Sequence, residues 1–196
     1  MNLAKTLGSL EKTRDIYFDW FDGLAWTKKL YLTLSVAMIT GIAAQLRIPL
    51  PFTPVPITGQ VFVVLLSGIV LGHIYGGLSM MLYASIGFAG MPWFSGSVSG
   101  LPISPTTGYV LGFIPAAFLV GWITQRYRQS HSFINLIGLM MIAVSIIYIF
   151  GALHFTIFMQ SSIKTTLYLT VLPFIPVDLI KALAAACAAR VLLPNR

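Results

Sequence analysis

Beyond residue 22, the chain of 196 residues holds a single carboxylate, Asp178. Charged residues make up only 9% of the sequence, whereas hydrophobic residues make up 57%. Soluble domains carry about 25% charged residues, so this chain has too few polar side chains to cover a surface that faces water. Inside a bilayer, a helix satisfies its own backbone polar groups. The sequence therefore predicts an all-α integral membrane protein.

Six apolar stretches divide the chain, and most are close to the ~20 residues that a helix needs to cross a bilayer. They lie at residues 26–48, 57–75, 76–90, 106–124, 133–158 and 172–193, and the third is the shortest. A proline-rich segment at 49–56 and an uncharged loop at 91–105 separate some of them. This pattern predicts six transmembrane helices in one domain, residues 26–196.

The basic residues predict how these helices are oriented. An even number of spans places both termini on one side of the membrane. If that side is cytoplasmic, it holds most of the basic residues near the spans, as the positive-inside rule requires, and leaves Arg47 and Lys164 outside. The cytoplasmic set is then Lys28, Lys29, Arg126, Arg128, Arg190 and Arg196. Basic residues confined to helix ends give no patch for nucleic acid, so we expect a multi-pass membrane protein with both termini cytoplasmic.

Residues 1–25 differ from the rest, because aromatic side chains alternate with charged ones there. Amphipathic segments of this kind lie in the membrane interface. We therefore expect an interfacial helix at the N-terminus, with a partly ordered tail as an equal alternative.

Asp178 and Lys181 stand three residues apart in the last apolar stretch. This spacing places both side chains on one face of a helix. A buried charge is costly unless it is paired, and charged residues inside membranes usually serve a function. The pair is therefore the leading candidate for a site that binds a polar ligand at the outer end of the bundle. A structural ion pair that holds the last helix in place is the alternative.

Further polar and aromatic residues fall near the predicted outer ends of the other helices. Pockets for small ligands are mostly apolar with a few placed polar groups, and these residues would supply such groups. Each of them alone also fits ordinary interfacial placement or helix capping. The candidates are Gln45, Thr58, Gln60, Tyr83, Trp93 and Tyr109.

Ala37 and Gly41 form a pair of small residues four apart in the first apolar stretch. Small residues let another helix approach closely. The spacing fits a contact with a partner protein and internal packing of the same bundle equally well.

Motifs for catalysis and for metal binding are missing from the sequence. The three histidines, His73, His131 and His154, have no metal-ligand spacing, and no Walker A motif for ATP hydrolysis is present. We therefore expect neither an enzyme, nor a metal site, nor a cofactor.

Four segments together resemble the BioY family, the biotin-binding membrane subunits (S components) of energy-coupling factor (ECF) transporters. These segments are residues 45–60, residues 66–72 followed by Tyr83, residues 105–113 and residues 173–182. The resemblance covers roughly residues 30–192. The loop at 94–100 departs from the Gly-rich sequence usual in relatives, so no ligand contact is carried over from it.

The resemblance implies a six-helix S-component bundle in the cytoplasmic membrane of a prokaryote, with biotin bound at the outer face and captured with high affinity. It implies that Asp178 and Lys181 contact the ureido end of biotin. It also implies that Ala37 and Gly41 pack on the transmembrane T subunit, which two cytoplasmic ATPases drive. A different class of function, a solitary proton- or ion-coupled carrier that uses Asp178 as a relay, is the alternative.

Overall fold

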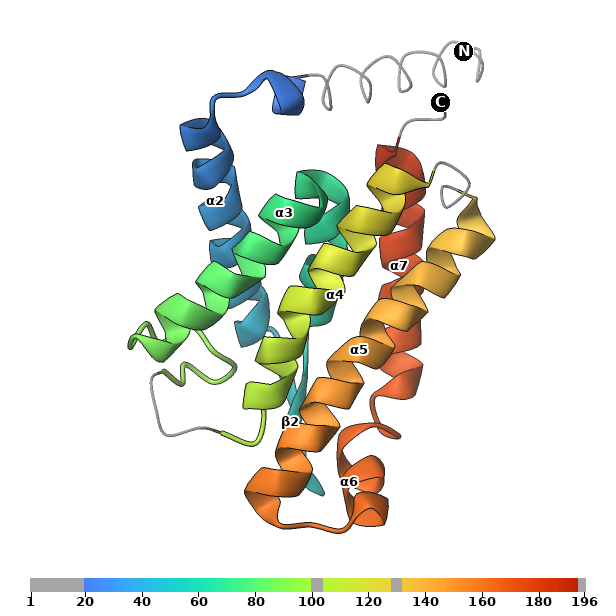
Figure 1. Cartoon of the computed structure of the whole chain (residues 1–196). Coiled ribbons are helices and arrows are strands. Elements are labelled where there is room, and N and C mark those ends of the chain that lie inside the picture. The colour runs from blue at the N-terminus through green and yellow to red at the C-terminus, as the bar shows by residue number, and fades with distance from the viewer. Residues whose placement is uncertain (1–19, 100–103, 128–131, 194–196) are drawn as a thin grey trace.

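The structure is a computed structural model that describes residues 20–99, 104–127 and 132–193. Most of the predicted interfacial segment, together with Arg128 and Arg196, lies outside the described residues. The chain forms a bundle of helices (Figure 1), and the start of α2 lies at the same end of the bundle as the end of α7. In chain order the elements are α2 (Trp26–Gln45), β1 (Arg47–Leu50), β2 (Thr53–Thr58), α3 (Gln60–Phe88), α4 (Thr107–Arg126), α5 (Phe133–Met159), α6 (Ile163–Thr170) and α7 (Ile175–Leu192).

The coarse prediction of a mostly helical membrane protein agrees with these elements. In the described part of the chain, three helices are long and apolar enough to cross a membrane, α3, α4 and α5. A fourth span results if α6 and α7, which are bent by 52° relative to each other, are counted together. The described residues therefore give three or four candidate spans by this measure, rather than the six that we predicted.

The second and third predicted spans lie in α3, which folds back on itself at Gly72. Gly72 has φ of 74°, a left-handed conformation that glycine adopts without strain. In a straight helix, residues 68 and 76 would lie about 12 Å apart. A Cβ built on Gly76 would instead lie 2.9 Å from the Cα atom of Gly68. The two arms of α3 are therefore packed side by side, as two predicted spans would be.

A small antiparallel sheet, β1 and β2, corrects the expectation of an all-α fold. It lies in the proline-rich segment, where proline prevents a regular helix. Arg47 pairs with Thr58, Ile48 with Ile57 and Leu50 with Thr53, with an irregularity between Ile48 and Leu50. Proline lacks a backbone N–H and is tolerated on edge strands, and both strands of a two-stranded sheet are edges.

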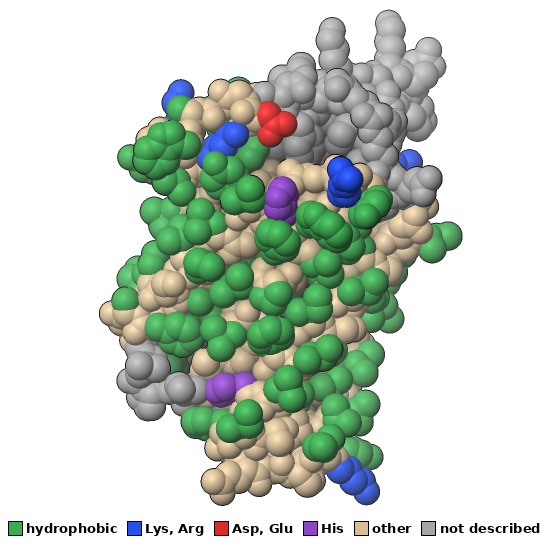
Figure 2. Space-filling model, viewed as in Figure 1, with side chains coloured by type: hydrophobic (Ala, Val, Ile, Leu, Met, Phe, Trp, Pro, Cys, Tyr) green, Lys and Arg blue, Asp and Glu red, His purple; other side chains and the backbone are tan. Residues whose placement is uncertain are grey.

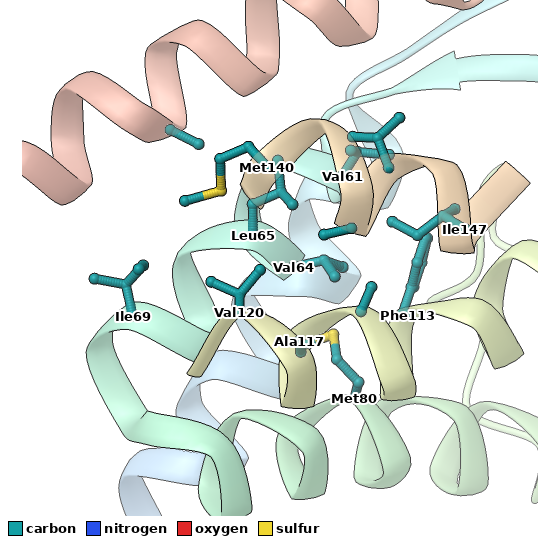
Figure 3. Close-up of a cluster of buried hydrophobic side chains, with 14 of the residues drawn as sticks. Val61, Val64, Leu65, Ile69, Met80, Phe113, Ala117, Val120, Met140 and Ile147 are labelled. Carbon is teal, nitrogen blue, oxygen red and sulfur yellow. The ribbon is translucent and has the colours of Figure 1, made fainter. Parts of the chain in front are cut away.

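The main core is formed by apolar side chains from α3, α4 and α5 (Figure 3). Val64 and Leu65 of α3 and Val120 of α4 have no exposed surface. Met140 of α5 is equally buried and belongs to the same cluster as Leu65. The glycines on these helices allow close contact, because a Cβ on Gly68 would meet the backbone of α4.

Exposed apolar side chains cover much of the outside of the bundle. Figure 2 shows hydrophobic side chains across the middle of one face, with lysine and arginine side chains at its two ends. Large side chains such as Ile142, Leu153 and Ile157 are more than half exposed. An apolar surface this extensive is expected where lipid surrounds the protein.

Ala37 and Gly41 both point into the molecule. Ala37 has no exposed surface and belongs to the main core. Gly41 is buried against Trp93, since a Cβ at this position would lie 3.1 Å from two atoms of that side chain. In this conformation the pair therefore serves internal packing, one of the two uses that its spacing allowed.

The first described residues are attached to the end of the bundle where α2 begins. Phe21 is buried and packs edge-on against Tyr75, with their ring centroids 6.0 Å apart. The ammonium of Lys29 lies 5.4 Å from the Phe21 ring centroid and donates to the backbone oxygen of Asp22 at 3.0 Å. Aromatic packing and a cation–π contact therefore join this segment to α2 and α3.

Candidate functional site

An apolar hollow opens between β2, α4, α5 and the start of α7. It encloses about 580 Å³ of empty space, including the open solvent at its mouth. Loop residues Phe94 and Ser95 form part of its wall. Its apolar lining residues include Val55, Ile57, Val61, Val110, Phe113, Ile147 and Phe174.

Asp178 and Lys181 line this hollow at the start of α7. Asp178 lies in the first helical turn, where the helix dipole favours a negative charge. Its Oδ1 atom accepts a hydrogen bond from Lys181 Nζ at 2.7 Å. The Asp178 side chain is 6% exposed and the Lys181 side chain is 15% exposed. The ion pair that the spacing predicted is therefore formed within the protein itself.

Tyr148 of α5 is the second partner of the Asp178 carboxylate. Its hydroxyl donates to Asp178 Oδ2 at 2.7 Å, and its ring lines the same hollow. A carboxylate has about four acceptor positions, so Asp178 can still accept hydrogen bonds from a ligand. Tyr148 was not predicted from the sequence, although a hydroxyl within the apolar stretch at 133–158 was a signal that could have indicated it.

Three of the other candidates also line the hollow: Thr58, Gln60 and Tyr109. Thr58 donates to Gln60 Oε1 at 3.1 Å, and Gln60 Nε2 donates to the Tyr83 hydroxyl at 2.7 Å. The Tyr109 hydroxyl donates to the backbone oxygen of Thr170 at 2.7 Å. Because these side chains already have partners, their orientations toward the hollow are fixed before any ligand arrives.

The remaining candidates, Gln45, Tyr83 and Trp93, hold the loop that follows α3 and do not line the hollow. Gln45 Nε2 donates to the backbone oxygens of Trp93 and Phe94, at 3.2 and 3.1 Å. Trp93 Nε1 donates to the backbone oxygen of Tyr83 at 3.0 Å. The sequence indicated which end of the bundle they occupy, but not which neighbours they contact.

Replacing Tyr148 with phenylalanine is expected to lower the stability of the folded chain. The change removes a hydrogen bond to a buried carboxylate, which contributes about 1.5–3 kcal/mol. Thermal unfolding in detergent measures the effect. Tyr31→Phe is the matched control. Tyr31 is 73% exposed, so removing its hydroxyl should leave the unfolding temperature nearly unchanged. Equal unfolding temperatures for the two variants would contradict the contact.

Comparison with known proteins places the chain in a family. The model of the BioY family matches residues 11–195. A probable biotin transporter BioY from Methanothermobacter thermautotrophicus is 39% identical over 66% of this chain and 88% of its own length. The biotin transporter BioY of Thermotoga maritima is 35% identical over 72% of this chain and 83% of its own.

A solved structure has the same fold. The crystal structure of the S component for biotin from an ECF-type ABC transporter superposes with a TM-score of 0.76 and 26% sequence identity. The match covers 87% of this chain and 94% of the other. The fold, the family model and the relatives agree, and the chain belongs to the BioY family.

Proposed function

We propose that this chain captures biotin at the outer mouth of its bundle, as the S component of an ECF transporter. Its relatives are named biotin transporters, and the solved structure with the same fold is an S component for biotin. The observation that carries the proposal is the buried cluster of Asp178, Lys181 and Tyr148 at one side of an apolar hollow. A transporter subunit of this family is not an enzyme.

The cluster suits the chemistry of biotin, which has a polar ureido ring, an apolar thiophane body and a carboxylate tail. Asp178 accepts from the ureido N–H groups, because an ionised carboxylate only accepts hydrogen bonds. Lys181 donates to the ureido oxygen or neutralises Asp178. The apolar wall packs against the thiophane ring. Thr58, Gln60 and Tyr109 complete the contact set, whereas Gln45, Tyr83 and Trp93 hold the loop that covers it.

We infer six membrane segments: α2, the two arms of α3, α4, α5, and α6 with α7. Lys28, Lys29 and Arg126 lie at one end of this arrangement and Arg47 at the other, as the positive-inside rule requires for cytoplasmic termini. The hollow then opens on the outer side of the cytoplasmic membrane of a prokaryote.

We expect transport to require the ECF T subunit and two cytoplasmic ATPases. A membrane partner needs a surface that faces lipid, and Ala37 and Gly41 do not reach one in this conformation. Met38, Ile39 and Ile42, on the other side of α2, are 47%, 50% and 67% exposed. We therefore propose that this exposed face of α2, rather than the small-residue pair, is available for coupling.

Equilibrium binding of labelled vitamins to the purified, detergent-solubilised chain tests the proposal. We expect saturable binding of biotin at one site, with no detectable competition from thiamine or riboflavin, because neither combines a ureido ring with an aliphatic carboxylate. Absence of biotin binding would contradict the proposal. Uptake that requires a proton gradient and no ATPase partner would instead favour the carrier that uses Asp178 as a relay.

A further inference from the structure

The end of the bundle where α2 begins carries a group of cations that the ligand site does not use. Lys28 and Lys29 lie in the first turn of α2, and Arg126 is the last residue of α4. Lys28 and Arg126 are exposed, and Lys29 is partly exposed. These three residues form a basic rim. On the face that Figure 2 shows, lysine and arginine side chains gather at this end, beyond the band of hydrophobic side chains.

A series of contacts across the bend of α3 joins the two parts of the basic rim. The Lys29 ammonium lies 5.8 Å from the ring centroid of Tyr75, just after the bend. Two residues earlier, the backbone N–H of His73 donates to Gln125 Oε1 at 3.2 Å, and His73 Nδ1 contacts the same oxygen. Gln125 directly precedes Arg126 in α4. The cations of α2 and α4 therefore belong to one continuous surface around the bend.

The basic rim has little internal counter-charge. Among residues 20–99, 104–127 and 132–193, Asp22 is the one carboxylate at this end, because Asp178 lies at the opposite end of α7. Lys29 Nζ donates to the backbone oxygen of Asp22. Neither Lys28 nor Arg126 forms a salt bridge with another described residue. The positive charge of these two side chains is therefore available to an anion outside the chain.

Exposed aromatic side chains accompany the cations of the basic rim. Trp26 is three residues before Lys29, and Trp122 is four residues before Arg126, so each pair shares one face of its helix. Tyr127 packs edge-on against Trp122, with their ring centroids 6.1 Å apart. Exposed tryptophan and tyrosine are enriched at the level of the lipid headgroups, because their rings are apolar and their tips are polar. The aromatic residues therefore place the rim at the depth of phospholipid phosphates.

We propose that the basic rim binds anionic phospholipids, with Lys28 and Arg126 on the headgroup phosphates and the exposed tryptophans against the start of the acyl chains. Arginine binds phosphate through paired hydrogen bonds, and lysine supplies a compact charge. A zwitterionic lipid offers the same phosphate, but its own cation offsets the charge. A free phosphate offers the charge without an acyl chain for the apolar surface next to the rim. This surface does not depend on which ligand the hollow binds.

The test compares binding of phosphatidylglycerol and phosphatidylcholine to the purified full chain in detergent, measured by native mass spectrometry. Each cation should favour the anionic lipid about fivefold, so the three cations give the parent chain a preference of about a hundredfold. Lys28→Gln and Arg126→Gln should each reduce this preference about fivefold, and together about 25-fold. Lys164→Gln is the matched control, because Lys164 is an exposed cation of α6 at the opposite end of the bundle, and it should leave the preference unchanged.

Two further measurements separate this proposal from its rivals. Glycerol 3-phosphate, added at the same concentration as the lipid, should not displace phosphatidylglycerol, whereas displacement would make the rim a site for small phosphates and overturn the proposal. Without lipid, the Lys28 and Arg126 variants should unfold at the parent temperature, because neither side chain has a salt-bridge partner among the described residues. Equal binding of both lipids by the parent chain, or an equal loss of preference in Lys164→Gln, would also overturn it.

Discussion

Asp178→Asn is expected to reduce biotin affinity by about a hundredfold or more, the usual effect of removing one member of a buried charged contact. The asparagine has nearly the same shape, but it loses the negative charge and one of the acceptors for ureido N–H groups. It also replaces an acceptor-only group with one that carries N–H donors. Equilibrium binding of labelled biotin to the purified variant measures the effect.

This variant needs a control for folding, because it leaves Lys181 without its partner. Breaking a buried ion pair costs about 3–5 kcal/mol, whereas replacing both members with neutral groups is often tolerated. The double variant Asp178→Asn with Lys181→Met should therefore unfold at a higher temperature than Asp178→Asn, yet bind biotin no more tightly than that single variant. Parent-like binding by either variant would show that the pair only holds α7 in place.

Gly68→Ala is expected to destabilise the bundle strongly, although it adds only one methyl group. The new Cβ would meet the backbone oxygen of Ala117 and would lie 2.8 Å from the backbone nitrogen of Gly121. Backbone atoms cannot move aside as a flexible side chain can, so the cost should reach or exceed the ~3 kcal/mol upper range of overpacking. Thermal unfolding in detergent gives the comparison.

Gly138→Ala is the matched control for this change. Gly138 is also in the interior of a helix, and a Cβ there would have no atom within 4 Å. Alanine favours a helix by roughly 0.5–1 kcal/mol over glycine, so this variant should be as stable as the parent or slightly more stable. Equal unfolding temperatures for the two variants would mean that α3 and α4 are not in backbone contact at Gly68.

The sequence was sufficient for features that depend on local spacing and on composition. The shortage of charge predicted a membrane protein, and the three-residue separation of Asp178 and Lys181 predicted their contact, because helical periodicity alone brings them together. The proline-rich segment was correctly excluded from any helix. These conclusions need no knowledge of which distant segments meet.

Features that depend on distant contacts could not be predicted in the same way. Tyr148 is 30 residues from Asp178, and Gln45 is 48 residues from Trp93. Periodicity does not indicate which face of one helix meets another, so Ala37 and Gly41 fitted two interpretations equally. The break between the second and third predicted spans was placed at residues 75 and 76, whereas the chain bends at Gly72, since a glycine within an apolar stretch also occurs in straight helices.

The most direct test of the central claim is an experimental structure of this chain with biotin bound. We predict that a ureido nitrogen lies about 3 Å from the Asp178 carboxylate, within hydrogen-bond distance, with Lys181 at the same end of the ligand. Biotin bound outside the hollow, or with its carboxylate at Lys181 and its ureido ring at the mouth, would contradict the account.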